Sequence, residues 1–503
     1  MKKIIKHKNL LIFIYALGIS FGVLLFASKN SFLYPLNDWV DANAFFTVGK
    51  SMFHGLVPYR DLFEQKGPFL YLIYGFASLI SFKTFIGVFI LEVLFWALAL
   101  YFLYKTLHLF ISSKSALIIL PIFMSIIATT RAFTHGGSAE EFCVPFFFIT
   151  LYYFIKHFKV GPISKKAMFL NGIISGLVLL IKYSLLGFFF AFTLAIFVDF
   201  LLKKDIKKAI SYPLILLLGM FVPFVAFLIY FAINGAVFDF LHSYFYVNIF
   251  SYSEQTMGIL DKLSKLFTGF GNALMRNIPS FILLLVALIL LWPLKLSKRA
   301  KILLLVSFLL TVLGIYFGLK FYRYYILFIL FFSSIGFLTL FALFDKYLVK
   351  LNYKIYCPIL ILISAISIFN GYYNANYKEN MSYQKSDLFQ YTFADIINKE
   401  EDATVVSMGN VDSGIYTTTG LYPSTYFFER LNISYDTFPD NIDALNTYIK
   451  NKETMFIVYF TKLKEDVLKE REEELYINYD LITSKSQIYE DKTYYAYLFK
   501  VKE

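Results

Sequence analysis

Long apolar runs separated by short polar loops make up most of the sequence. About 20 apolar residues in a helix cross the ~30 Å hydrocarbon core of a bilayer, since each adds about 1.5 Å. Eleven runs reach or approach that length: 9–28, 86–104, 116–131, 143–156, 167–181, 184–202, 209–233, 278–294, 302–319, 325–344 and 355–371. The pattern predicts a polytopic α-helical membrane protein with about eleven transmembrane helices.

A twelfth apolar run, residues 68–82, is too short to cross comfortably, because fifteen helical residues reach only ~22 Å. If it lies in the outer interface as a re-entrant or horizontal helix, the inner loops hold 21 Lys and Arg and only two carboxylates, Asp205 and Asp345. Counting it as a crossing would put those basic loops outside, against the positive-inside rule. We therefore expect a multi-pass protein of the cytoplasmic membrane, with the N-terminus in the cytoplasm and the C-terminus outside.

The N-terminal run follows four lysines and begins like a signal peptide. It is about twenty residues long and lacks a small-residue cleavage site, so we expect a retained anchor. The two cysteines, Cys143 and Cys357, lie at a loop edge and inside an apolar run, and we expect no disulfide and no metal site from them.

The composition becomes that of a soluble domain from about Gly371. Residues 1–371 hold 33 Lys and Arg against 13 Asp and Glu, whereas residues 372–503 hold 14 against 22. The net charge of +12 therefore belongs to membrane loops, which argues against a nucleic-acid partner.

Secondary-structure patterns also change after Gly371. Amphipathic helix patterns cover 388–400 and 440–451, and β-branched and aromatic residues predict strands at 403–408, 454–460 and 493–502. We expect two domains: a transmembrane domain over 1–371, with an outer loop at 29–67, and an extracytoplasmic soluble α/β domain over 372–503.

The first outer loop is dense in polar groups. It contains Asp38 and Asp41, and later Tyr59-Arg60-Asp61 and Lys66-Gly67-Pro68. A short amphipathic helix is expected from Asp41 to about Gly55. Two interpretations of Asp38 and Asp41 stay open: either carboxylate caps this helix, or it does chemistry at the helix N-terminus.

Further charges stand at the outer ends of apolar runs. Glu140 and Glu141 end the second outer loop and are either solvated or bind a hydroxyl-rich ligand. Lys182 and Arg323 lie at outer turns, where each either snorkels or meets a lipid phosphate. Glu92, roughly 10 Å into its run, is either a functional group or a neutral hydrogen-bonded one.

The inner loops lack the carboxylates that nucleotide-sugar and ATP chemistry usually needs for metal binding. The chain also has no Gly-rich phosphate loop. Chemistry is therefore expected on the outer face, where an activated donor would have to be carried by a lipid.

These loops resemble those of the GT-C superfamily of membrane glycosyltransferases, which use polyprenyl-phosphate-linked sugars. They are most like bacterial relatives of the protein O-mannosyltransferases and the lipid A aminoarabinose transferases. Those relatives have an Asp before a short helix, then a Gly, a Tyr-x-Asp stretch and Lys-Gly-Pro. The matching residues are Asp41, Gly55, Tyr59-Arg60-Asp61 and Lys66-Gly67-Pro68.

The second loop and a later lysine extend the resemblance to about residues 30–330. A Gly-rich loop ending in Glu-Glu matches 136–141, and a lysine after a Gly-containing apolar run matches Lys182. Two positions depart from the pattern: Ala42 stands where many relatives have Glu, and Arg323-Tyr324 where some have His-Tyr.

The resemblance implies an inverting hexosyl- or pentosyltransferase that moves a sugar from a polyprenyl-phosphate donor to a hydroxyl of a glycan, lipid or protein. The implied roles are a catalytic base at Asp41 or Asp38, donor-phosphate binding by Lys66, Lys182 and Arg323, and positioning of the acceptor or sugar by Asp61, Glu140 and Glu141. No cofactor is predicted, and a divalent metal is left open.

Two other functions fit part of the pattern. A transporter or flippase of lipid-linked glycans would use the same lysines without a base, but it needs polar residues through several helices. A polymerase or ligase of such glycans usually places its chemistry in one large loop.

Overall fold

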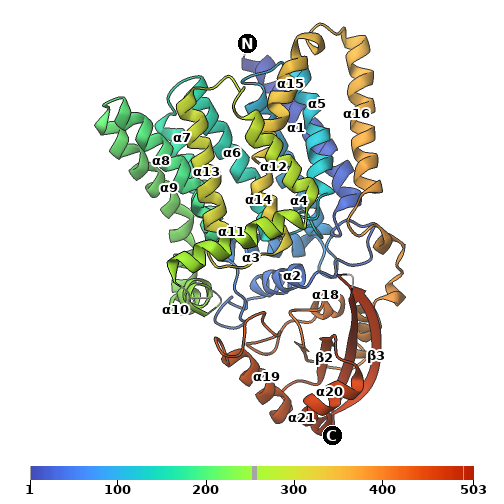
Figure 1. The fold of residues 1–503 in the computed structure, drawn as a ribbon. Helices are drawn as coiled ribbons and strands as arrows, with labels where there is room; N and C mark the ends of the chain where they lie inside the picture. Colours follow the sequence, from blue (N-terminus) through green and yellow to red (C-terminus); the bar gives the residue numbers. More distant parts are fainter. Residues whose placement is uncertain (1, 252–257, 491) are drawn as a thin grey trace. The chain divides into compact units, whose positions relative to one another are not determined.

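Two compact units make up the computed structural model, which describes residues 2–251, 258–490 and 492–503, with side chains from residue 7 onward (Figure 1). Unit 1 comprises Met1–Ser31, Phe89–Leu228 and Thr256–Lys378. Unit 2 comprises Phe32–Val88, Ile229–Gln255 and Glu379–Glu503.

Unit 1 is helical in the residues described. Its elements are α1 (Lys2–Ala27), α4 (Ile86–Leu107), α5 (Ser113–Ala128), α6 (Ala139–Lys159), α7 (Lys165–Leu179), η1 (Tyr183–Leu186), α8 (Gly187–Leu202), α9 (Ile206–Ile233), α11 (Ile259–Met275), α12 (Ile278–Leu290), α13 (Lys298–Tyr316), η3 (Arg323–Ile326), α14 (Leu327–Leu330), α15 (Ser333–Leu348) and α16 (Tyr353–Tyr373), with the ends of α4 and α9 passing into unit 2. Every one of the eleven predicted apolar runs overlaps one or more of these helices, although some runs, such as 278–294 and 302–319, extend a few residues past the helix end.

Helix length and composition support membrane crossing. Among the described residues, six helices are long and apolar enough to span, or up to eight if two bent helix pairs each form one span. The pairs are 259–275 with 278–290, bent by 111°, and 323–330 with 333–348, bent by 41°. The predicted polytopic helical membrane fold is confirmed; the larger number counted from the sequence includes shorter helices such as α5.

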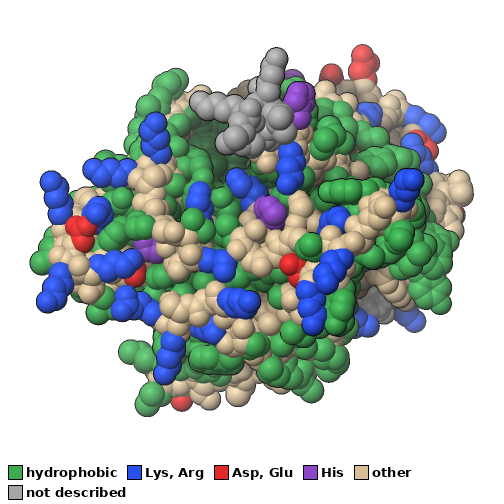
Figure 2. Space-filling view, turned by 90° about the horizontal axis from the view of Figure 1, so that it is seen from above, with side chains coloured by type: hydrophobic (Ala, Val, Ile, Leu, Met, Phe, Trp, Pro, Cys, Tyr) green, Lys and Arg blue, Asp and Glu red, His purple; other side chains and the backbone are tan. Residues whose placement is uncertain are grey.

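Basic side chains gather at the end of unit 1 that holds the N-terminus. Successive long helices run in opposite directions, so the loops after α4, α6, α8, α12 and α15 lie at this end (Figure 1). Figure 2 looks onto it and shows Lys and Arg side chains spread across the face, with fewer Asp and Glu. The exposed lysines of 203–208 and 295–298 belong to these loops.

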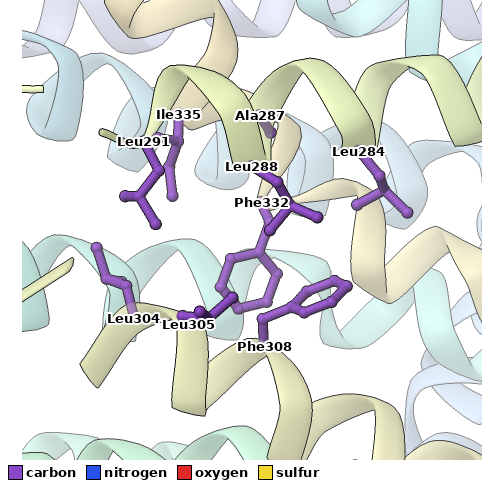
Figure 3. A pocket seen from close by; sticks show the side chains of 9 residues that line it. All are labelled: Leu284, Ala287, Leu288, Leu291, Leu304, Leu305, Phe308, Phe332 and Ile335. Atoms are coloured by element: carbon purple, nitrogen blue, oxygen red, sulfur yellow. The ribbon is translucent and has the colours of Figure 1, made fainter. Parts of the chain in front are cut away.

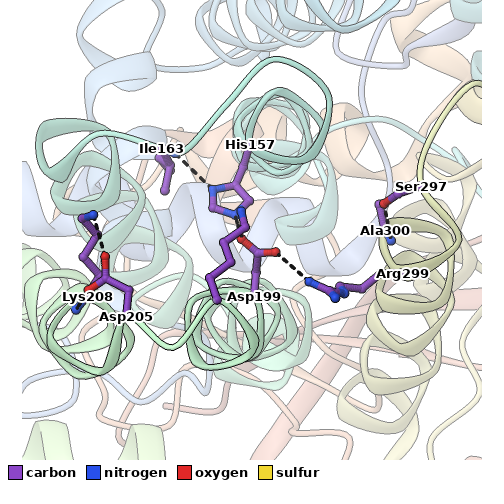
Figure 4. Close-up of polar contacts among 9 residues, drawn as sticks. His157, Ile163, Asp199, Asp205, Lys208, Ser297, Arg299 and Ala300 are labelled. Carbon is purple, nitrogen blue, oxygen red and sulfur yellow. Dashed lines mark hydrogen bonds and ion pairs between the residues drawn. The ribbon is translucent and has the colours of Figure 1, made fainter.

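A buried carboxylate ties three helices together at the same end (Figure 4). Asp199 of α8 lies 2.9 Å from His157 Nε2 of α6, 2.6 Å from Lys203 Nζ and 3.4 Å from an Arg299 nitrogen of α13. His157 Nδ1 accepts the Ile163 N–H (3.1 Å), so Nε2 carries the proton that His157 donates to Asp199. This ion cluster is a structural tie, because each charge has a partner.

Unit 2 combines two helices of the first loop with a small sheet. Its elements are α2 (Val40–Phe53), α3 (Pro68–Ile80), α10 (Val237–Phe240), η2 (Leu241–Ser251), η4 (Lys378–Ser382, which starts in unit 1), η5 (Lys385–Asp387), α17 (Phe389–Ile397), β1 (Val405–Met408), α18 (Ile415–Thr419), α19 (Asp440–Asn451), β2 (Phe456–Thr461), α20 (Glu465–Arg471), α21 (Glu473–Asn478), β3 (Tyr479–Tyr489) and β4 (Lys492–Val501). The sheet order is β1-β2-β4-β3; β1 and β2 are parallel, and the other neighbours are antiparallel.

The predicted α/β character of the C-terminal residues is confirmed. Both predicted helices and all three predicted strands are present as α17, α19, β1, β2 and β4. The long strand β3 was not predicted, because polar residues of the stretch Thr483–Gln487 hide the apolar alternation.

The first loop contributes to the core of unit 2. The Phe63 ring stacks on Phe438 (centroids 5.5 Å apart) and packs against Phe427 (5.2 Å), in one cluster with Val406 of β1 and Phe499 of β4. This loop is therefore built into the core around the sheet.

The helices α2 and α3 touch through their backbones. A Cβ on Gly49 would lie 2.6 Å from the Gly75 nitrogen, so only glycine permits this approach. The thirteen residues of α3 reach roughly 20 Å, in keeping with the expected short helix over 68–82.

Candidate active site

The helix that carries Asp41 begins one residue earlier than predicted. Its N-cap is Trp39, with no side-chain capping bond, so neither Asp38 nor Asp41 holds the N-cap position. Asn43 secures the start instead, because its amide donates to the Asn37 and Trp39 carbonyls (2.8 and 2.9 Å). Asp41 is half-buried in the first turn, where the helix dipole favours a carboxylate, and Asp38 is buried.

The structure brings Lys66 to the same side of α2 as Asp41. The Lys66 ammonium lies 5.4 Å from the centre of the Phe45 ring, and Phe45 stands one helical turn after Asp41. Lys66 Nζ is also 3.9 Å from a carboxylate oxygen of Glu64. The Glu64 carboxylate accepts hydrogen bonds from the Lys66 backbone N–H (2.7 Å) and from the Tyr71 hydroxyl. The loop between α2 and α3 thus holds the Glu64 carboxylate and the Lys66 ammonium close together.

Asp61 makes local contacts. Its carboxylate pairs with Arg60 (2.7 Å) and accepts the Val57 N–H (2.7 Å), which holds the turn after α2. The Arg60 guanidinium keeps the pKa of Asp61 below its usual value. The expected role of Asp61 at a sugar or acceptor stays a prediction.

In unit 1, Lys182 and Glu140 form an ion pair with little solvent access. The Lys182 side chain is 11% exposed and that of Glu140 is 2% exposed. The ammonium also lies 3.6 Å from the centre of the Tyr325 ring, in a cation–π contact. The lysine expected either to snorkel or to bind phosphate is therefore held at a fixed point.

Glu141 and Glu92 form a buried carboxyl pair beneath the second loop. Glu141 accepts the Trp96 indole N–H (2.6 Å) and the Gly137 N–H (2.7 Å), while Glu92 accepts the Ser28 hydroxyl (2.7 Å). These bonds hold the loop in place. Glu141 thus supports the loop, whereas its neighbour Glu140 faces Lys182.

Two cations of unit 1, Lys29 and Arg323, lie near His135 of the second loop. The His135 ring is buried and stacks on Tyr377 (4.3 Å), and the ammonium of buried Lys29 lies 4.8 Å from the centre of the Tyr377 ring. Burial places the pKa of His135 well below its usual value, and the positive charges of Lys29 and Arg323 lower it further. Arg323 itself is exposed at the start of η3, and Lys29 is a cation that the sequence analysis did not select.

Unit 2 also contains buried ionisable groups that the sequence analysis missed. Burial lowers the pKa of Lys50 on α2 to about 7 and raises that of Asp412 to about 6. Burial also raises the pKa of Glu429, and the charges of Asp412, Glu64 and Asp41 raise it further. The polar spacing of Asn43, Thr47 and Lys50 was the one signal in the sequence for a buried polar helix face.

A small apolar pocket lies in unit 1 between α12, α13 and the start of α15 (Figure 3). Figure 3 shows side chains of α12 and α13 pointing toward one another across it. Its lining is apolar throughout: Leu284, Ala287, Leu288, Leu291, Leu304, Leu305, Phe308, Phe332 and Ile335. For metal binding, no three His, Cys, Asp or Glu side chains are grouped suitably within the described residues.

Comparison of the whole chain with solved structures identifies its fold. The crystal structure of ArnT from Cupriavidus metallidurans bound to undecaprenyl phosphate aligns over 97% of both chains, with a TM-score of 0.54 and 11% identity. The chain has the GT-C fold. The apo structure of the same ArnT gives a TM-score of 0.54 at 10% identity over 98% of both chains.

A second GT-C structure also matches. The archaeal oligosaccharyltransferase AglB from Archaeoglobus fulgidus, in complex with an inhibitory peptide and a dolichol-phosphate, aligns over 92% of this chain and 70% of its own, with a TM-score of 0.50 and 14% identity. No protein-family model and no curated protein matches the sequence. The resemblance seen in the loop motifs is confirmed at the level of the GT-C fold.

Proposed function

We propose that this protein is an inverting membrane glycosyltransferase, which moves a sugar from a polyprenyl-phosphate donor to an acceptor hydroxyl on the outer face of the cytoplasmic membrane. The observation that carries the proposal is the GT-C fold, shared along 97% of the chain with an ArnT bound to undecaprenyl phosphate. The charged loop residues supply the chemistry that such a reaction requires.

Cations are needed where the donor phosphate departs. As the bond between the sugar and the phosphate breaks, negative charge grows on the phosphate oxygen, and fixed cations stabilise it. Lys66, Lys182 and Arg323 serve this role in the proposed reaction. The pairing of Lys182 with Glu140 fixes the lysine before the donor binds, so that a phosphate joins or replaces the carboxylate as its partner.

Asp41 is the proposed base, with Asp38 as the alternative. Asp41 takes the proton of the acceptor hydroxyl while the hydroxyl oxygen bonds to the anomeric carbon from the face opposite the phosphate. The bond from that carbon to the phosphate oxygen breaks, and the polyprenyl phosphate leaves with the electron pair. One displacement inverts the anomeric configuration.

The rest of the chain fits a lipid-linked substrate. The side chains that line the pocket between α12 and α13 are all apolar, the lining that contact with a hydrocarbon chain requires. The basic loops at the N-terminal end of unit 1 support a cytoplasmic position for that end, and with it an outer-face position for Lys182 and the second loop at the opposite helix ends.

A transporter or flippase for the same lipid-linked glycans remains the second candidate, since it would use the same cations. It would move the donor intact and would not depend on Asp41. The cleavage of the donor therefore separates the two functions.

The test uses the full chain in sealed liposomes, supplied with a panel of polyprenyl-phosphate sugars. We expect release of polyprenyl phosphate and appearance of the sugar on water or on an added acceptor. Movement of intact donor across the bilayer without cleavage would support the transporter and overturn the proposal.

A further inference from the structure

Helix α2 has a buried polar row on the side opposite Asp41. Asn43, Thr47 and Lys50 are spaced by four and three residues, so their side chains share one helix face. Lys50 stands nine residues after Asp41, and at about 100° per residue the two point in roughly opposite directions. Lys50 is only 1% exposed and Asn43 and Thr47 are fully buried.

Every member of this row bonds to one segment of the C-terminal residues, 412–417. The Thr47 hydroxyl donates to Asp412 Oδ2 (2.7 Å), and the Lys50 ammonium donates to the Tyr416 carbonyl (2.6 Å). The Thr417 hydroxyl donates to Asn43 Oδ1 (2.8 Å). Three bonds along about two turns of helix fix its rotation as well as its position.

The receiving segment is itself fixed to the sheet. Asp412 Oδ1 accepts the Gly414 N–H (2.9 Å), and the Asp412 N–H donates to buried Glu429 (2.8 Å). The Tyr416 hydroxyl donates to the Val405 carbonyl of β1 (2.8 Å). Gly414 has φ +92°, and a Cβ there would lie 3.1 Å from Asn43, so the contact with α2 is close.

Charge makes Asp412 the critical member of the contact. Burial lowers the pKa of Lys50 to about 7; the Asp412 carboxylate favours the charged form of Lys50, whereas Lys83 opposes it. Loss of the Asp412 carboxylate removes the anion that favours a charged Lys50 at this buried position. A charged Lys50 is then stable only if the helix turns or shifts to bring the ammonium to water, and Asp41 moves with the helix.

We propose that Asp412 is a positioning residue for sugar transfer: it holds the Asn43, Thr47 and Lys50 face of α2 and thereby aims Asp41 at the acceptor. The C-terminal domain is then a working part of the transferase. The inference rests on the proposed function, because it gives Asp41 the role of base. A base acts only within hydrogen-bond reach of the proton it takes, so small rotations of α2 are costly.

The test compares four full-length variants with the wild type. Asp412→Asn keeps the shape, and its single amide oxygen can still accept the Gly414 N–H, while its amide nitrogen can only donate to the Thr47 hydroxyl. The change also removes the negative charge that favours a charged Lys50. Lys50→Met removes the buried cation, and the double variant removes both charges. Asp443→Asn is the matched control, because Asp443 is an exposed aspartate in the same unit that bonds to Tyr435.

Two readouts are measured on each variant. Hydrogen exchange of the α2 amides, residues 40–53, reports whether the helix is held, and it needs no activity. Steady-state kinetics per folded molecule give kcat and the donor KM. We expect Asp412→Asn to speed exchange in α2 and to lower kcat at least ~10-fold with little change in donor KM.

The double variant should restore kcat to within a few-fold of wild type, and Asp443→Asn should match wild type in both readouts. An active wild type with unchanged kcat in Asp412→Asn overturns the inference and leaves the proposed function standing. Loss of folded protein with unchanged kcat in what remains also overturns it, since Asp412 would then be structural alone. A wild type that cleaves no donor overturns the proposed function itself, whatever the exchange data show.

Discussion

Lys182 and Glu140 form a buried ion pair across the start of η1 and the first turn of α6, with the ammonium against the face of Tyr325. The two residues are 42 positions apart, so the pair could not be read from their spacing. The ion pair changes the effect on stability that we expect from a substitution at Lys182. A snorkelling lysine would contribute little to stability, whereas loss of one partner of a buried pair costs ~3–5 kcal/mol.

The first prediction concerns this pair and the donor phosphate. Lys182→Ala should weaken donor binding at least ~10-fold, because a cation is lost and the Glu140 charge then repels the phosphate; one factor of ten corresponds to ~1.4 kcal/mol. Lys182→Arg should retain part of the affinity, and Lys182→Ala combined with Glu140→Gln should recover part of it. The measurement is Kd for a polyprenyl-phosphate sugar in detergent or nanodiscs.

The matched control is Lys354→Ala, which removes an exposed lysine from the same unit. Its donor affinity should equal that of wild type. If Lys182→Ala binds donor as tightly as this control, Lys182 has no phosphate role and the ion pair is structural.

The second prediction concerns topology. A reporter fused after Lys502 should register outside the cell, and one inserted in the loop at 203–208 should register in the cytoplasm. The physical reason is the excess of 21 basic residues over two carboxylates in the predicted inner loops. A cytoplasmic C-terminus would reverse the assignment and move the second loop and Lys182 to the inner face.

The sequence predicted the helices of unit 1 well, because a bilayer imposes its thickness on every crossing segment. Runs such as 209–233 and 355–371 have no other way to satisfy their backbone groups in lipid. The small sheet was predicted in part. Strand β3 was missed because a hairpin strand with one solvated face needs few apolar residues, and Ser484, Lys485 and Ser486 look like a loop.

The candidate site was predicted in its residues but not in its partners. The loop motifs selected Asp41, Lys66 and Lys182, which the GT-C resemblance placed in one reaction. Asp412 was not selected, because its contact Thr47 is 365 positions away and nothing local to Asp412 indicates it. Long-range polar pairs form through the tertiary fold, so they appear only in the structure.

The third prediction follows from the buried state of Lys50. Its folded pKa of about 7 lies below the ordinary value of 10.5, so between these values the unfolded chain binds more protons than the folded one. The free energy of unfolding should therefore rise with pH in this window, by up to ~1.4 kcal/mol per pH unit from this group. Asp412, with its raised pKa of about 6, acts with the opposite sign below that value.

The measurement compares the thermal unfolding midpoints of wild type and Lys50→Met from pH 7 to pH 9. Besides Asp412, the titratable groups near Lys50 are Tyr416, whose pKa is raised, and Lys83, whose charge lowers the pKa of Lys50. Both are present in each protein, so the difference between the two curves isolates Lys50. Wild type should gain stability relative to Lys50→Met as the pH rises, and parallel curves would contradict a lowered pKa of Lys50 in the folded protein.

The last prediction concerns Asp41 and separates a transferase from a transporter. Asp41→Asn keeps the size of the side chain and leaves the start of α2 secured by Asn43, so the fold should change little. An amide cannot take the proton of the acceptor, so transfer should fall ~10²–10⁴-fold, the usual contribution of general acid–base catalysis. Donor Kd should stay near that of wild type, because Lys66 and Lys182 are unchanged.

Asp38→Asn, measured side by side, is the informative comparison, since Asp38 lies three residues earlier and is buried at 5% exposure. If Asp41 is the base, Asp38→Asn should affect stability more than turnover. A silent Asp41→Asn with an inactive Asp38→Asn would move the base to Asp38. Full turnover in both variants would show that donor cleavage needs no carboxylate from this loop, and it would remove Asp41 and Asp38 from the proposed mechanism.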